Sequence, residues 1–442
     1  MKPILDETHD PSTRSWVESA NAVQADFPIQ NLPFGIFRKR DSGMARVGVA
    51  IGDAILDIAS LHNELWFNHE GDATVTEACR SGSLNELMAL GSGPRRALRT
   101  RLHALLRTDA TASDRQAVSR CLVPQAEAAM LLPAEVGDYT DFYASIFHAT
   151  NVGRLFRPDN PLLPNYKYIP IGYHGRSSSL VPSGTAVRRP CGQTRDADAE
   201  PAFGPSKALD YELEVGFFVS ASNALGEAIP ISEAEEHIFG VCLVNDWSAR
   251  DMQAWEYQPL GPFLAKSFAT SLSPWVVTME ALAPFRSPGS ARAEGDPVPL
   301  PYLLDPGDRG YGGVDLKLEV FLSSERMRDA GIAPACLSRG NLRHMYWTIG
   351  QMLTHHASNG CNLRPGDLLA SGTVSGPEKD ARGCLLEMTS RGKEPITLPT
   401  GEQRKFLEDG DEVRLHGFCE SEGFRRIGLG DCRGIVLPAR TE

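Results

Sequence analysis

The hydrophobic positions of this chain change their spacing about a third of the way along. Residues 34–58 hold short apolar runs that alternate with polar positions and are separated by Gly- and Asp-containing turns, which predicts a small antiparallel meander. Residues 83–90 and 94–107 have helical spacing, with Pro94 suited to a first turn and leucines at 98, 102, 105 and 106 on one face. The arginines at 95, 96, 99, 101 and 107 are interpreted as a solvated helix face.

Beyond residue 132 the pattern changes to many short strands that end at Gly and Pro. Strands are predicted at 212–219, 240–245, 314–323, 368–372, 384–389, 412–417 and 434–437. Helices are predicted at 232–239, with Ser232 and Glu235 as a capping box, and at 343–358, whereas the proline-rich residues 283–304 are predicted to form a long surface loop. A chain of 442 residues is long for one core. We therefore expect a β-rich α+β protein with two domains, residues 1–132 and 133–442.

Two glutamates interrupt the apolar run at 208–219. Glu212 and Glu214 are two residues apart, so in a strand their carboxylates point to the same face. A solvent-facing pair on an edge strand is the alternative, which apolar residues at 213, 215, 217 and 218 disfavour. Burying two like charges is costly unless a cation neutralises them. We interpret the pair as half of a metal site.

Two aspartates complete this candidate. Asp246 ends the apolar run 238–245, at a strand end where sites are often assembled. Asp141 lies in an aromatic segment and by itself would be read as a turn residue. Together the four acids could give an all-oxygen shell, which selects Mg²⁺, Ca²⁺ or Mn²⁺ over zinc.

His148 follows Asp141 by seven residues, so one loop could supply both a ligand and a base. A lone histidine is more often structural, but this one is accompanied by Arg157, Tyr173, Arg250, Gln253, Tyr257 and Lys266. The Arg, Lys and Gln side chains among them can bind a carboxylate or stabilise an oxyanion. His355 and His356 are adjacent and would diverge by about 100° on a helix, which favours packing. Thr373 lies in a turn and could offer its hydroxyl to a ligand.

Composition excludes several classes of protein. The formal charge of −12 argues against a nucleic-acid groove, and no apolar run approaches the ~18 residues of a membrane span. The nine cysteines are spread without a Cys-x-x-Cys motif, so neither disulfides nor a zinc ribbon are expected. Residues 1–12 lack the features of a secretory signal, so a cytoplasmic location is the default.

Several segments closely resemble the fumarylacetoacetate hydrolase family: residues 138–143, 148–153, 172–176, 212–214, 245–251, 255–257, 266–268 and 362–373. The resemblance runs from about residue 138 to the C-terminus, and the meander is similar to the family's small SH3-like β-barrel domain. Glu-x-Glu with a later Asp marks the wider superfamily, and the His and Arg motifs favour the fumarylacetoacetase family within it. The resemblance implies a large mixed β-sandwich roll, a homodimer and bound Mg²⁺ or Ca²⁺.

The resemblance also implies roles for individual residues. The metal ligands would be Asp141, Glu212, Glu214 and Asp246, with Lys266 and Thr270 near the metal, either in direct contact with it or in its outer shell. His148 would be the general base, oriented by Glu387. Developing negative charge would be stabilised by Arg250, Gln253 and Lys266, and substrate would be held by Tyr143, Arg157, Tyr173, Gln253, Tyr257 and Thr373.

The implied reaction is hydrolysis of the carbon–carbon bond of 4-fumarylacetoacetate, a diketo acid, to fumarate and acetoacetate, the last step of tyrosine and phenylalanine catabolism. Acylpyruvate hydrolysis, or decarboxylation and isomerisation of a 2-oxo acid, is the nearest alternative. A non-catalytic domain with structural Ca²⁺ is another, but it leaves His148, Glu387 and Lys266 without roles.

Overall fold

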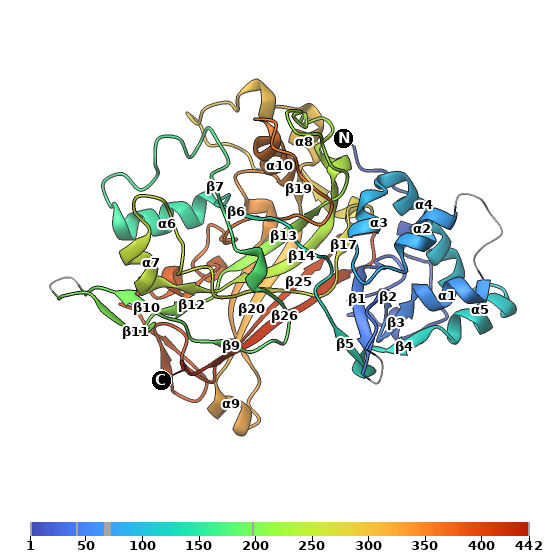
Figure 1. The fold of residues 1–442 in the computed structure, drawn as a ribbon, viewed down its shortest axis with the longest axis horizontal. Helices are drawn as coiled ribbons and strands as arrows, with labels where there is room; N and C mark the ends of the chain where they lie inside the picture. Colours follow the sequence, from blue (N-terminus) through green and yellow to red (C-terminus); the bar gives the residue numbers. More distant parts are fainter. Residues whose placement is uncertain (1, 41–42, 66–71, 197–198, 441–442) are drawn as a thin grey trace.

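The computed structural model describes residues 2–40, 43–65, 72–196 and 199–440 (Figure 1). Its N-terminal part is a five-stranded sheet in the order β4-β3-β2-β1-β5, covered by helices. The strands are β1 (Phe34–Lys39), β2 (Arg46–Ile51), β3 (Ala54–Asp57), β4 (Leu122–Pro124) and β5 (Ala128–Met130). The helices are α1 (Ile58–Leu65), α2 (Asp72–Ala78), α3 (Asn85–Ala89), α4 (Ser92–Leu106) and α5 (Ala112–Ser119). The predicted meander and both predicted helices of this part are confirmed.

The rest of the chain is built on two larger sheets. The first has the order β7-β6-β22-β13-β14-β16-β8, with β17 also paired to β14. These strands are β6 (Tyr139–Phe142), β7 (Gly172–His174), β8 (Leu180–Pro182), β13 (Leu213–Val219), β14 (Ile238–Asp246), β16 (Thr270–Leu272), β17 (Val277–Thr278) and β22 (Leu368–Ala370). The second sheet has the order β21-β20-β25-β26-β9, made of β9 (Val187–Arg188), β20 (Leu316–Ser323), β21 (Ala335–Asn341), β25 (Glu412–Cys419) and β26 (Ile427–Leu437).

Short elements decorate these sheets. The paired short strands are β10 (Cys191–Thr194) with β11 (Ala202–Pro205), β12 (Leu209–Asp210) with β15 (Ser248–Ala249), β18 (Arg286–Ser287) with β19 (Gly313–Val314), and β23 (Ile396–Thr397) with β24 (Gln403–Arg404). The helices are α6 (Ile146–Phe156), α7 (Arg250–Glu256), α8 (Pro306–Tyr311), α9 (Glu325–Asp329), α10 (Ile349–Ala357) and α11 (Leu385–Met388). The expected β-rich mixture of strands and helices is confirmed.

Strands β13 and β14 are buried on both faces, which explains their continuous apolar sequence. Alternate residues face opposite ways: Phe217 and Leu243 belong to the core shared with the second sheet. Phe218 and Val244 belong instead to the core shared with the N-terminal part. The second core crosses the domain boundary that the sequence predicts near residue 132, so the two parts pack together closely.

Two predicted elements have a different structure. Residues 384–389 were expected as a strand but contain the helix α11. The Asp210 carboxylate accepts the backbone N–H groups of Leu385 (2.8 Å) and Leu386 (3.0 Å), which caps the start of this helix. Residues 234–237 form only a 3₁₀ turn without the expected Ser232 capping box, because Ile238 already begins β14.

The last predicted helix starts later than expected, at Ile349. Its capping box is formed by Thr348 and Gln351. The proline-rich residues 283–304 are irregular, as predicted, except for 3₁₀ turns at Ala283–Phe285 and Pro301–Leu303 and the strand β18.

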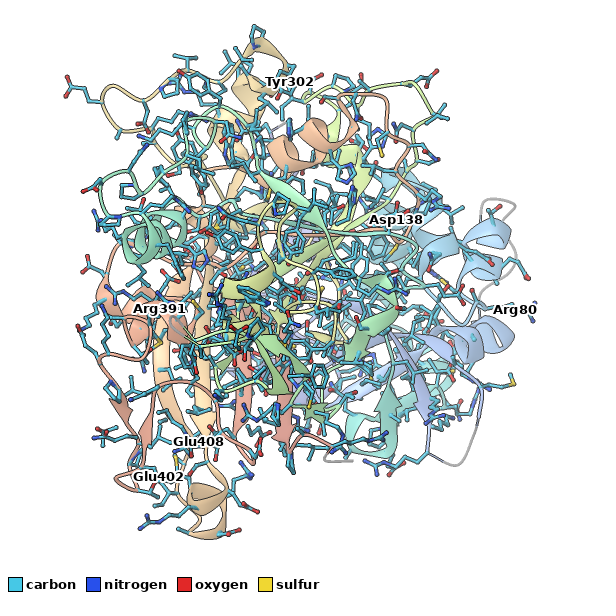
Figure 2. The ribbon with its side chains drawn as sticks, turned by 60° about the vertical axis from the view of Figure 1, so that its left-hand side comes forward. Arg80, Asp138, Tyr302, Arg391, Glu402 and Glu408 are labelled. Carbon is cyan, nitrogen blue, oxygen red and sulfur yellow. The ribbon has the colours of Figure 1, made fainter. Side chains whose placement is uncertain are left out.

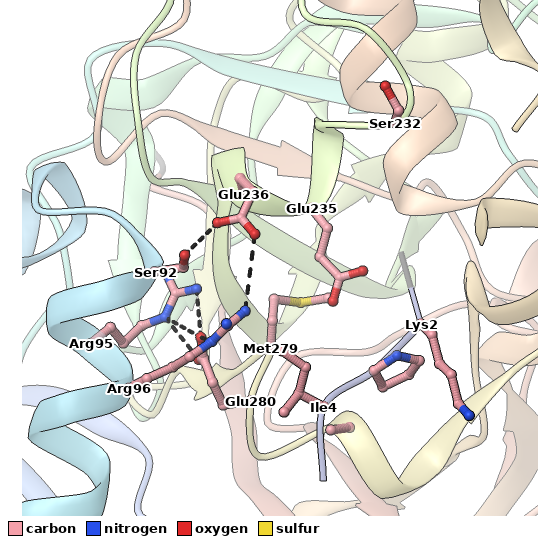
Figure 3. Close-up of a pocket in the computed structure, with 12 residues that line it drawn as sticks. Lys2, Ile4, Ser92, Arg95, Arg96, Ser232, Glu235, Glu236, Met279 and Glu280 are labelled. Atoms are coloured by element: carbon pink, nitrogen blue, oxygen red, sulfur yellow. Dashed lines mark hydrogen bonds and ion pairs between the residues drawn. The ribbon is translucent and has the colours of Figure 1, made fainter.

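The arginines of α4 do not form one solvated face, so that interpretation is wrong for two of them. Arg95 is 2% exposed and donates to both carboxylate oxygens of Glu280 at 2.8–3.0 Å. Arg99 is also buried and donates to two backbone carbonyls. Figure 3 shows Arg95, Arg96 and Glu280 at a small pocket between α4 and residues of the larger, C-terminal part of the chain. Charged side chains therefore tie the N-terminal helix to the rest of the molecule.

Another ion-pair network is centred on Arg404, in β24. Glu402 and Glu408 lie near each other in Figure 2, and Arg404 pairs with both at 3.1 Å. Arg404 also donates to the buried Asp411 at 2.8 Å, which ties β24 to the start of β25. All nine cysteines are free. Among the described residues, no helix has the length and apolar character needed to cross a bilayer.

Candidate metal centre and active site

The four predicted carboxylates meet at one end of the first sheet. Asp141, Glu212, Glu214 and Asp246 are all buried and each offers an oxygen within 4.8 Å of the others. The alternation of side chains along a strand explains why two of these carboxylates lie together. Glu214 is on the same face of β13 as Phe218, and Asp246 is on the same face of β14 as Val244. The register of these strands, with β22 between β6 and β13, carries Asp141 to the same end.

Glu214 shows most directly that a cation fits this cluster. Its side chain is fully buried, and among the described residues neither carboxylate oxygen has a hydrogen-bond partner. Burial, followed by repulsion from Asp141 and Asp246, raises the pKa of Glu214 well above its usual value. Burial, followed by repulsion from Asp246, also raises the pKa of Asp141 well above its usual value. A buried carboxylate without partners is costly, and an all-oxygen donor set suits a hard divalent cation.

The other two carboxylates are partly neutralised by neighbouring cations. The Lys266 ammonium donates to both Glu212 and Asp246, and Arg250 pairs with Glu212 at 2.7 Å. Although burial opposes it, Lys266 and then Arg250 lower the pKa of Glu212. Thr270 donates to Asp246 at 2.7 Å. Lys266 and Thr270 thus contact the carboxylates of the cluster, in positions that fit an outer shell around a metal.

His148 and Glu387 form a second buried group beside the carboxylates. The Nδ1 atom of His148 lies 2.6 Å from Oε2 of Glu387, although the two residues are 239 positions apart in sequence. Despite burial, the interaction with His148 lowers the pKa of Glu387 to about 2, so this carboxylate is ionised at neutral pH. The positive charge of a protonated His148 would also lower the pKa of Glu212 in the carboxylate cluster.

The predicted substrate contacts are brought together to different degrees. Tyr173 donates its hydroxyl to Asp246 at 3.0 Å, and the Tyr143 ring stands edge-on to His148 with centroids 5.2 Å apart. Thr373 is buried, and its hydroxyl has no hydrogen-bond partner in the part of the chain that the structure describes, so it can bind a ligand. Tyr173 thus contacts the carboxylate cluster, and Tyr143 packs against the imidazole.

The remaining predicted contacts lie on α7 and at the end of α6. Gln253 accepts a hydrogen bond from Arg250 at 3.0 Å, and Tyr257 is half-buried at the end of α7. Arg157 is exposed and donates to the carbonyl of Pro161 at 3.3 Å, so it is not directed at the carboxylates in this structure. The two adjacent histidines pack as predicted: His356 bonds to Thr140 at 2.8 Å.

Sequence reasoning missed four residues that support this site. Asp210 pairs with Arg250 at 2.9 Å and caps α11, and its position two residues before Glu212 could have indicated a third carboxylate on the same face. Asn151, Ser375 and Cys384 all donate to the Glu387 carboxylate. Asn151 could have been found from its helical spacing to His148, but Ser375 and Cys384 carry no sequence signal.

Comparison with known proteins identifies the family. Residues 139–437 match the family described as "Fumarylacetoacetate (FAA) hydrolase C-terminal", and residues 30–133 match "Fumarylacetoacetase N-terminal". The chain belongs to the fumarylacetoacetate hydrolase family. Within this family it is 50% identical to fumarylacetoacetase of Homo sapiens over 422 residues, covering 95% of this chain and 98% of the relative. It is 51% identical to that of Caenorhabditis elegans over 423 residues, covering 94% and 97%.

A solved structure shows the same fold. The fumarylacetoacetate hydrolase from psychrophilic Exiguobacterium antarcticum aligns with a TM-score of 0.50 and 18% identity, covering 92% of this chain and 100% of that one.

Proposed function

We propose that this protein is a metal-dependent hydrolase that cleaves 4-fumarylacetoacetate to fumarate and acetoacetate, the last step of tyrosine and phenylalanine catabolism. The observation that carries this proposal is a sequence identity of about 50%, over nearly the full length of the chain, to relatives named fumarylacetoacetase. The buried His148–Glu387 pair beside four carboxylates supports the same chemistry. Such a pair has no role in a domain that only binds structural Ca²⁺.

His148 and Glu387 would activate water. With its Nδ1–H held by Glu387, the imidazole keeps a lone pair on Nε2, which can take a proton from water as it attacks a carbonyl of the diketone. Glu387 then stabilises the imidazolium, and its low pKa keeps it ionised for this purpose.

The cationic and amide groups would stabilise the charge that develops on the substrate. Arg250, Gln253 and Lys266 lie along one side of the cluster, where loss of one preorganised donor can cost about 3 kcal/mol. Tyr143, Tyr173, Tyr257, Thr373 and Arg157 are proposed to hold the substrate.

Asp141, Glu212, Glu214 and Asp246 are proposed to hold Mg²⁺ or Ca²⁺, with Lys266 and Thr270 behind them. When bound, such an ion supplies positive charge that stabilises an enolate leaving group. The orphaned carboxylate of Glu214 favours this assignment.

We further propose a cytoplasmic homodimer in which residues 1–132 form an SH3-like domain and residues 133–442 the catalytic domain. An apolar surface around α7 supports the dimer: it contains Leu260 (96% exposed), Phe203, Phe263, Leu264 and Trp255. Gln193 lies between Trp255 and Phe203: its side chain accepts a hydrogen bond from the Trp255 indole, and its backbone lies opposite Phe203 in the β10–β11 strand pair.

The decisive assay follows the loss of diketone absorbance after fumarylacetoacetate is added to the metal-loaded protein and to protein treated with a chelator. We expect turnover with metal, release of fumarate and acetoacetate, and loss of turnover after chelation. An acylpyruvate and a 2-oxo acid are assayed separately as alternative substrates. A higher kcat/KM on either one, or full activity of metal-free protein, would contradict the proposal.

A further inference from the structure

The carboxylate of Glu387 receives its hydrogen bonds unevenly. Its Oε2 atom accepts from His148 at 2.6 Å, from Ser375 at 2.8 Å and from the Cys384 thiol at 3.3 Å. Its Oε1 atom accepts from the side-chain amide of Asn151 at 2.9 Å. Within the part of the chain that the structure describes, Asn151 is the donor recorded at Oε1.

This distribution matters because a glutamate does not fix the plane of its own carboxylate. The last torsion of the side chain is broad, so the orientation of the two oxygens depends on external hydrogen bonds. Hydrogen bonds to Oε2 alone fix the position of that one atom and leave the carboxylate free to rotate about it. A further hydrogen bond to Oε1 fixes the plane of the carboxylate. The direction of Oε2 in turn sets the ring orientation of His148, because its Nδ1–H points at that oxygen.

Two of these four donors, His148 and Asn151, belong to the same helix, α6. His148 and Asn151 are three residues apart, so they are neighbours on one face of the helix and each binds one oxygen of Glu387. We call this arrangement the two-point grip: His148 on Oε2 and Asn151 on Oε1. Because the two donors belong to one rigid element, the carboxylate and the imidazole cannot rotate independently.

A second connection closes the arrangement. Ser145 caps α6 by accepting the backbone N–H of His148 at 3.2 Å, and it donates its hydroxyl to the carbonyl of Ser375 at 2.9 Å. The Ser375 hydroxyl in turn donates to Glu387 and accepts the N–H of Gly383 at 2.9 Å. The start of the helix is therefore joined to the same carboxylate that its first turns bind.

We propose that Asn151 is a positioning residue, which orients the Glu387 carboxylate and through it the catalytic imidazole. This rests on the proposed function, in which His148 is the base. A neutral amide suits the role, because it fixes the carboxylate without cancelling the charge that stabilises the imidazolium. An arginine in this place would pair with Glu387 and weaken that stabilisation.

The kinetic test compares Asn151→Ala with Thr150→Ala, which alters the adjacent position of the same helix outside the grip. Loss of a hydrogen bond to a charged group should lower kcat by about 10- to 100-fold with KM unchanged, and Thr150→Ala should retain kcat. In a Glu387→Gln background Asn151→Ala should add little, because the carboxylate is already gone. An equal loss in both backgrounds, or a raised KM with normal kcat, would overturn the proposal.

A spectroscopic test separates this inference from the proposed reaction. In the full-length protein labelled with ¹⁵N-histidine, the Nδ1-bound proton of His148 is identified as the downfield signal that is lost in His148→Gln. We expect this proton to exchange faster with water in Asn151→Ala and to be unchanged in Thr150→Ala. If wild-type protein fails to cleave fumarylacetoacetate, the proposed function is wrong, and this signal still decides the grip. An identical signal in Asn151→Ala would overturn it.

Discussion

Replacing Arg95 with methionine should destabilise the protein substantially, although Arg95 lies far from the carboxylate cluster in sequence. Its guanidinium is buried against Glu280, whose side chain is only 9% exposed, and it also stacks over the Phe239 ring at 5.3 Å. Methionine keeps the apolar stem and removes the charge. Glu280 would then be left buried with a weaker partner, Arg96, at 3.6 Å.

The magnitude follows from the burial. Removing one partner of a buried ion pair costs about 3–5 kcal/mol, because the remaining charge loses its compensation. Arg96 can move toward Glu280, so we expect the lower end, about 3 kcal/mol. Arg96 itself is 42% exposed, and Arg96→Met should cost under about 1 kcal/mol, as for other exposed ion pairs.

The measurement is urea-induced unfolding followed by tryptophan fluorescence, with metal at saturation in every sample. The double variant Arg95→Met, Glu280→Leu should recover much of the lost free energy of unfolding, because no unpaired charge remains. Equal losses for Arg95→Met and Arg96→Met would refute the reasoning. A double variant as unstable as Arg95→Met would show that the loss comes from packing, not charge.

Three other predictions concern the site and the pH dependence of the protein's stability. Glu214→Gln should raise the melting temperature of chelated protein, because it removes one of four repelling carboxylates, and should weaken Mg²⁺ binding in calorimetry; tighter binding would contradict the ligand assignment. His148→Ala should keep metal affinity and lose turnover, and Glu387→Gln should lower kcat by orders of magnitude without adding to that loss; multiplicative losses in steady-state kinetics would exclude the dyad. Burial, then Arg99, lowers the pKa of His103 to about 4 in the folded protein, so the stability present above about pH 6.5 should be lost as pH falls toward 4. His103→Gln should flatten the fall in melting temperature between pH 7 and 4, and an unchanged slope would rule out His103 as its source.

The sequence by itself determined the elements whose pattern is local and strong. The alternating runs of β1, β2 and β3 and the leucine face of α4 follow from spacing alone. The meeting of the two glutamates also follows, because strand geometry sets the direction of side chains two residues apart.

Only the tertiary structure decided the rest, because it depends on contacts between distant segments. Residues 385–388 became a helix because Asp210, 175 positions earlier, binds its first N–H group. Arg95 became buried because Glu280 supplies a carboxylate from another part of the chain. The pairing of His148 with Glu387 was implied by the family resemblance, but only the fold revealed that Asn151 binds the second oxygen of that carboxylate. Local patterns set the direction of a side chain within its element, whereas the energy of a buried charge depends on which partner the fold brings to it.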